Sequence, residues 1–77
     1  MPLKMYSFYD SVSKQSVCIN FYRDDHEAQR EALHILESIP EYKRKDIKVF
    51  YIGTFNTETL VIEPNEPYLC FSLEDDA

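Results

Sequence analysis

The spacing of apolar residues changes at one point in the chain, and this change limits the folds that the chain can adopt. Residues 15–22 alternate between apolar and polar side chains, as in a strand with one covered face. Over residues 25–39 the apolar residues recur instead at intervals of three and four, which is the spacing of one helical stripe. Asp24 and Glu27 have the spacing of a capping box at the start of this helix, and Pro40 ends it. The sequence therefore predicts a strand followed directly by a helix.

Alternating side chains predict three more strands, at residues 3–9, 47–55 and 60–63. The first of these is close enough to residues 15–22 to pair with them as a hairpin. The predicted order is therefore strand, strand, helix, strand, strand. The simplest fold with this order is α+β, with a small antiparallel sheet and the single helix packed on one of its faces.

The remaining segments are predicted to be irregular. Residues 41–46 read as a charged loop. Pro64 and Pro67 lack the amide donor that a strand ladder needs, so pairing continues past them only at the edge of a sheet. Residues 68–77 form a tail that is expected to be extended or frayed. We treat residues 1–77 as a single domain, because 77 residues suffice for no more than one.

The composition excludes several classes of function. The net charge is −6, so the chain as a whole does not attract phosphate backbones, and any contact with nucleic acid needs a local patch. Gly53 is the only glycine, which excludes a glycine-rich phosphate loop. The N-terminal residues carry no signal peptide, so we expect a cytoplasmic protein with reduced, packed thiols at Cys18 and Cys70.

The chain shows no set of residues with the spacing of a catalytic or metal site. His26 and His34 lie eight residues apart, too far along a helix for one metal ion. No nucleophile motif surrounds the serines, and no CxxC pair is present. We therefore expect a binding protein that is not an enzyme and that uses no metal or cofactor.

One segment departs from the acidic background. Residues 41–48 carry four basic and two acidic side chains, a balance of +2. Basic groups beside aromatic rings form the kind of surface that binds single-stranded nucleic acid. The alternative is a solvated loop whose cations complement the negative end of the helix. The candidate nucleic-acid-binding residues are Lys43, Arg44, Lys45 and Lys48 for phosphate, Tyr42 and Phe50 for stacking, and Arg23 and Arg30 at the start of the helix.

Aromatic residues make up 14% of the chain, more than one helix is expected to cover. Either the helix, the tail and neighbouring side chains pack both faces of the sheet, or the surplus rings form a protein interface, where aromatics concentrate. The small size and the surplus rings lead us to expect a homodimer. The candidate interface residues are Tyr6, Phe8, Tyr22 and Tyr51, with Phe50 on the same predicted face.

Several short motifs occur in an order that resembles a known family. They are the opening Met5–Val12 strand, the helix start with Phe21, Ala28 and Arg30, the Val49–Phe55 strand with Gly53, and the closing Leu60–Pro64 strand. Together they resemble a small nonstructural protein family of gokushovirus-type microviruses, which are bacteriophages with single-stranded circular DNA. The family usually has a glycine in its last turn, which this chain lacks, and the tail from Tyr68 has no counterpart.

The resemblance implies a nonstructural protein of the Microviridae that acts in viral DNA replication or in single-stranded DNA accumulation, in the host bacterial cytoplasm. It implies binding of single-stranded DNA or of the replication complex, and no catalytic residues. The alternative is an acidic adaptor that docks a host or phage replication protein through an aromatic sheet face. The net charge of −6 favours that alternative.

Overall fold

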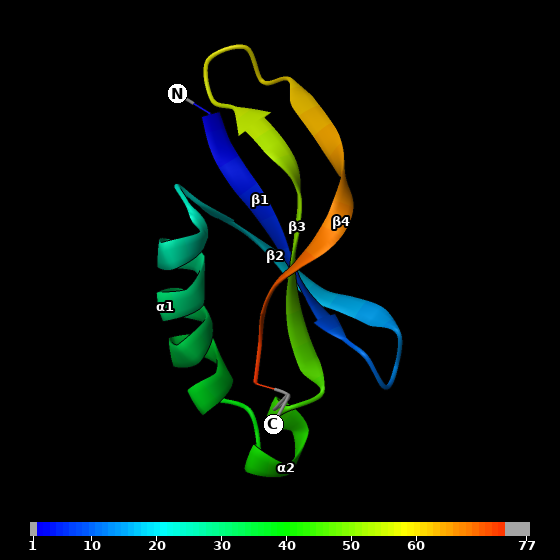
Figure 1. Cartoon of the computed structure of the whole chain (residues 1–77). Helices are drawn as coiled ribbons and strands as arrows, with labels where there is room; N and C mark the ends of the chain where they lie inside the picture. The colour runs from blue at the N-terminus through cyan, green and yellow to red at the C-terminus, as the bar shows by residue number, and fades with distance from the viewer. Residues whose placement is uncertain (1, 74–77) are drawn as a thin grey trace.

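The computed structural model describes residues 2–73 and contains one sheet and one long helix. All strand pairs are antiparallel, the strand order is β2-β1-β3-β4, and α1 lies along one side of the sheet (Figure 1). The predicted α+β fold is therefore confirmed. Within the described residues no helix is long and apolar enough to cross a bilayer. The elements are β1 (Pro2–Asp10), β2 (Gln15–Tyr22), α1 (Asp25–Glu37), α2 (Glu41–Arg44), β3 (Ile47–Asn56) and β4 (Ile62–Ser72).

Two segments differ from the sequence-based expectation. The predicted loop at 41–46 contains the short helix α2. The predicted strand at 60–63 begins later and runs on through both prolines as the single strand β4. β4 tolerates the two prolines because it is an edge strand and because its pairing with β3 is irregular. Pro64 lies opposite Gly53, and the three residues 65–67 lie opposite a single residue of β3. Of the predicted tail, 68–72 belong to β4, and 74–77 lie outside the described residues.

The start of α1 follows the predicted capping box. The Glu27 amide donates to Asp24 Oδ1 at 2.9 Å, and Glu27 Oε1 accepts from the Arg23 amide at 2.7 Å. The first bond satisfies a backbone donor that the first helical turn leaves unpaired, and the second pairs the amide of the residue before the cap. The helix ends at Glu37, two residues before the predicted end, where Ser38 forms the C-cap.

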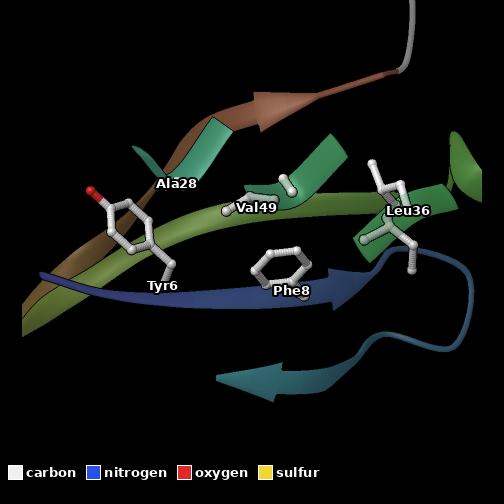
Figure 2. Close-up of a cluster of buried hydrophobic side chains, with 7 residues drawn as sticks. Tyr6, Phe8, Ala28, Leu36 and Val49 are labelled. Carbon is white, nitrogen blue, oxygen red and sulfur yellow. The ribbon is translucent and has the colours of Figure 1, made fainter. Parts of the chain in front are cut away.

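The buried core lies between α1 and the central strands. Tyr6 and Phe8 stand on β1 on the same side as Val49 of β3, and Ala28 and Leu36 of α1 pack over them (Figure 2). Small side chains on the helix let it approach the aromatic rings closely. The buried hydrophobic residues of the core are Tyr6, Phe8, Ala28, Ala32, Leu36, Ile47 and Val49.

This packing corrects the predicted placement of the aromatic residues. Tyr6 and Phe8 are 0% and 1% exposed and lie beneath α1, so they are not available to a partner. Tyr22 and Tyr51 pack against the same core. The sequence did not show which face the helix covers, because β1 and β3 carry apolar side chains on both faces. Of the five aromatic residues predicted on the uncovered face, only Phe50 lies there, opposite Ser7 of β1.

A carboxylate at the start of α1 joins the helix to two strands. Asp25 Oδ1 accepts from the Tyr6 hydroxyl at 2.5 Å, and Oδ2 accepts from the Tyr68 hydroxyl at 3.1 Å. The Tyr6 hydrogen bond lowers the pKa of Asp25, and the Tyr68 bond acts in the same direction, against the effect of burial. Burial and the bond to Asp25 raise the pKa of Tyr6. The cluster therefore links α1, β1 and β4 and favours an ionised Asp25.

We expect the Asp25 cluster to make stability depend on pH. Because the folded protein depresses the pKa of Asp25, its stabilising effect is present above the unfolded pKa of about 3.9 and is lost as the pH falls through the folded value. Asp25→Asn should lower the free energy of unfolding at neutral pH. The difference in the free energy of unfolding between this variant and wild type should become smaller in acid. Urea unfolding at several pH values measures this. A difference in the free energy of unfolding that stays constant with pH would contradict this prediction. Glu58→Gln, in the exposed β3–β4 turn, is the control.

At Gly53 the backbone of β4 passes close to β3. A Cβ at this position would meet the backbone oxygen of Glu63 at 2.5 Å and the Cα of Pro64 at 3.2 Å. Backbone atoms of a paired strand cannot move aside as a side-chain end can. We expect Gly53→Ala to lower the free energy of unfolding by about 1–3 kcal/mol, the usual cost of overpacking. Chemical denaturation measures the change, with Glu58→Ala as a matched exposed control. Equal free energies of unfolding for the two variants would contradict the prediction and would show that β3 and β4 can separate at Gly53 at little cost.

Candidate nucleic-acid interface

Basic residues gather at one end of the sheet. β1 ends beside the start of β3, with Asp10 opposite Ile47, and the Ser11 amide donates to the Asp46 oxygen at 2.9 Å. This pairing brings the turn at 11–14 to the same end of the sheet as α2, which directly precedes β3 (Figure 1). Five of the eight Lys and Arg residues therefore lie at this end. We call them the basic end: Lys14, Lys43, Arg44, Lys45 and Lys48.

Two of the predicted phosphate contacts and one predicted stacking residue are exposed on or beside α2. Lys43 and Lys45 are exposed, and the ring of Tyr42 is 73% exposed. The Lys43 Nζ lies 5.8 Å from the centre of the Tyr42 ring, within range of a cation–π contact. The amides of Val12 and Ser13 hold the pKa of Asp10 below its usual range, and the charge of Lys43 contributes.

Arg44 has a structural role within the basic end. Its Nε donates to the Ile39 oxygen at 2.9 Å, and a terminal nitrogen donates to the Glu37 oxygen at 3.3 Å. These carbonyls lie at and just beyond the end of α1, where backbone acceptors lack helical partners. Arg44 therefore ties α2 to the end of α1, in addition to any contact with a ligand.

Lys48 and Phe50 lie on the sheet face away from α1. Lys48 pairs with Tyr9 of β1, and Phe50 pairs with Ser7, two residues before Tyr9 on the same strand. The Tyr9 and Phe50 rings are 5.7 Å apart and nearly perpendicular. These two rings, together with Ser7, Ile52 and Pro67, line a shallow hollow of about 360 Å³. The structure therefore brings one predicted phosphate contact and one predicted stacking residue to the same face of β3.

Arg23 and Arg30 do not join the basic end. They line a hollow of about 280 Å³ near the start of α1, together with Asp24, His26 and Glu27. The 13 residues of α1 span about 20 Å and separate this hollow from α2. Its two carboxylates offset the two guanidinium charges. The eight residues predicted from the sequence therefore fall into two separate groups.

Sequence reasoning missed two features of this surface. Lys14 joins the basic end only through the pairing of β1 with β3, which its position in the chain does not show. The apolar side chains of β2, such as Ile19 and Phe21, also lie on the face away from α1, although their alternation with polar residues predicts a covered face. A signal was present, since strands with apolar residues on both faces are usually covered on both. We define the open face by six of its residues: Met5, Ile19, Phe21, Phe50, Phe55 and Leu69.

Both cysteines are free thiols in the structure. Cys18 is exposed on β2, contrary to the expectation of a packed thiol. Cys70 packs against the core, where burial, followed by the charge of Asp25, raises its pKa to about 11. Its thiol therefore stays protonated at neutral pH and packs as a small neutral side chain. Among residues 2–73 no three His, Cys, Asp or Glu side chains converge as a possible metal site.

Comparison with known proteins identifies the family. The family described as Phage ORF5 protein matches residues 3–75, nearly the whole chain. The chain belongs to this family. It is therefore a phage protein, which confirms the broader part of the resemblance found in the sequence. No curated protein and no solved structure matches this ORF5-family chain.

Proposed function

We propose that this phage protein acts in viral DNA replication or in the accumulation of single-stranded viral DNA, as one of the nonstructural proteins of gokushovirus-type microviruses. It works in the host bacterial cytoplasm and binds single-stranded DNA, or the replication complex on that DNA, through the basic end. The observation that supports this proposal is the concentration of five of the eight basic residues at one end of an acidic protein.

The charge distribution supports binding at this end. The two segments that hold the basic end, residues 10–14 and 41–48, carry five basic and three acidic side chains, a balance of +2. The rest of the chain must then carry −8, because the total is −6. A phosphate backbone is therefore repelled by most of the molecule and is attracted only to this region.

The aromatic residues near these cations support a preference for single strands. Tyr42 presents a largely exposed ring beside Lys43, and Phe50 lies two residues after Lys48. Unpaired bases stack on such rings, whereas bases inside a duplex cannot reach them. Cations that hold the phosphates and rings that hold the bases are the two parts of a single-strand site.

We expect replacement of Lys43 and Lys45 by Glu to abolish binding of a labelled single-stranded oligonucleotide at physiological salt. Arg44 is kept, because its contacts with the end of α1 stabilise the fold. If weak binding persists at low salt, the slope of log affinity against log salt should fall by about 1.4, since each phosphate neutralised on a single strand contributes about 0.7. Fluorescence anisotropy over a range of salt concentrations measures both quantities.

The control is the double variant Arg23→Glu with Arg30→Glu. It changes the net charge by the same amount but lies near the start of α1, so it should retain most of the affinity.

Tyr42→Leu should weaken single-strand binding by about tenfold, the loss of one stacked base, without changing the salt slope. Unchanged affinity after reversal of Lys43 and Lys45 would rule out the basic end as the binding site.

The apolar open face favours a second candidate function, the acidic adaptor. In that case the open face docks a host or phage replication protein, and the negative surface competes with nucleic acid. The same titration separates the two candidates, because an adaptor should not bind the oligonucleotide even at low salt. Recovery of a replication protein from infected cells with wild type, but not with an open-face variant, would then support the adaptor.

A further inference from the structure

The apolar side chains of β2 point away from the helix. Asn20 pairs with the buried Tyr6 and shares its side of the sheet, whereas Ile19 pairs with Ser7 on the opposite side. Phe21 pairs with Met5 and lies on the same side as Ile19. In a sheet with one wet face the polar residues of each strand face the water. In β2 this arrangement is reversed, so the sequence places its apolar residues on the face that no element within residues 2–73 covers.

The open face is a largely apolar strip, with Ser7 of β1 between Ile19 and Phe50. Ile19 is 48% exposed and Phe21 is 44% exposed. The Phe21 and Phe55 rings lie 5.7 Å apart across β1, and Phe50 contacts Tyr9 farther along the sheet. Leu69 of β4, opposite Phe50, extends the strip to the other edge. Exposed apolar patches mark interaction sites on soluble proteins.

We infer that a second copy of this chain covers the open face, with the two sheets packed face to face about a two-fold axis. The same residues then form both sides of the interface, as in other isologous dimers. Four strands span about 19 Å, and eight paired residues span about 26 Å, which gives a footprint of about 500 Å² per copy. Two such faces bury about 1,000 Å², the size at which a specific interface begins.

The chemistry of the open face favours a second copy over nucleic acid. Its six defining residues carry no charge, so self-association buries no unpaired ion. A single strand would need cations along the rings to hold its phosphates. Lys48 borders the face at one end only, and Lys43 and Lys45 are on or beside α2, outside it. Pairing of copies therefore covers Phe50, which belongs to the open face, and leaves the proposed DNA contact to Tyr42, Lys43 and Lys45 on or beside α2.

A second copy also meets a requirement of stability. Among residues 2–73, seven hydrophobic residues form the buried core on the helix side, and a core in so small a chain supplies little stability alone. Whatever covers the open face must be present whenever the chain is folded, and a second copy always is. The hollow beside Tyr9 and Phe50 provides a concave site for an apolar side chain of the facing sheet.

The solution mass tests this inference. We expect light scattering after size-exclusion chromatography to give twice the 9.1 kDa of the chain for wild type, and 9.1 kDa for Ile19→Lys or Phe21→Lys. Leu33→Lys is the matched control, because Leu33 is 49% exposed, close to the 48% of Ile19, but lies on α1. It should remain a dimer. Circular dichroism shows whether each variant keeps its fold.

A second measurement applies even if the lysine variants do not fold. The melting temperature of wild type should rise with protein concentration, because association stabilises only the folded state. A wild-type mass of 9.1 kDa together with a melting temperature independent of concentration would overturn the inference. A dimer that survives both Ile19→Lys and Phe21→Lys would also overturn it, since the copies would then meet elsewhere. Dimerisation only after addition of single-stranded DNA would assign the face to nucleic acid instead.

Discussion

The packing of α1 on Tyr6, Phe8 and Val49 determines how the rest of the molecule is arranged. Ala28 and Ala32 have small side chains, so the helix lies close to the aromatic rings. The chain has one long helix and a sheet whose central strands are apolar on both faces. The helix can cover only one of these faces, so its position decides which aromatic residues become core and which remain at the surface.

The functional surfaces follow from that arrangement. Antiparallel pairing of β1 with β3 brings the first turn beside α2, and Arg44 binds α2 to the end of α1. Charges separated by some thirty positions in the chain therefore meet at one end of the sheet. The aromatic and aliphatic residues that α1 does not cover lie on the opposite face. One end can thus attract phosphate while the open face attracts another apolar surface.

Much of the fold could be predicted from local patterns. Alternation located the first three strands but not the extent of β4, and the spacing of Asp24 and Glu27 located the start of the helix, because a capping box needs only neighbouring residues. The choice of covered face could not be predicted, since Tyr6 and Ile19 both belong to regular alternations and only tertiary packing separates them. The basic run at residues 41–48 was visible in the sequence. The contribution of Lys14 and the separation of Arg23 and Arg30 from that run were not visible, because they too depend on tertiary packing. The structural role of Arg44 depends on carbonyls that become available only where α1 ends.

The two prolines of β4 have a consequence for how sheets of separate molecules can join. β4 lies at one edge and contains Pro64 and Pro67 with Glu63 and Glu66, features that discourage pairing with another strand. β2 forms the other edge and contains neither proline nor charge. Head-to-tail growth needs both edges and would produce a fibre, whereas joining β2 to β2 stops at two molecules. The prolines therefore protect a chain rich in β structure against open-ended polymerisation.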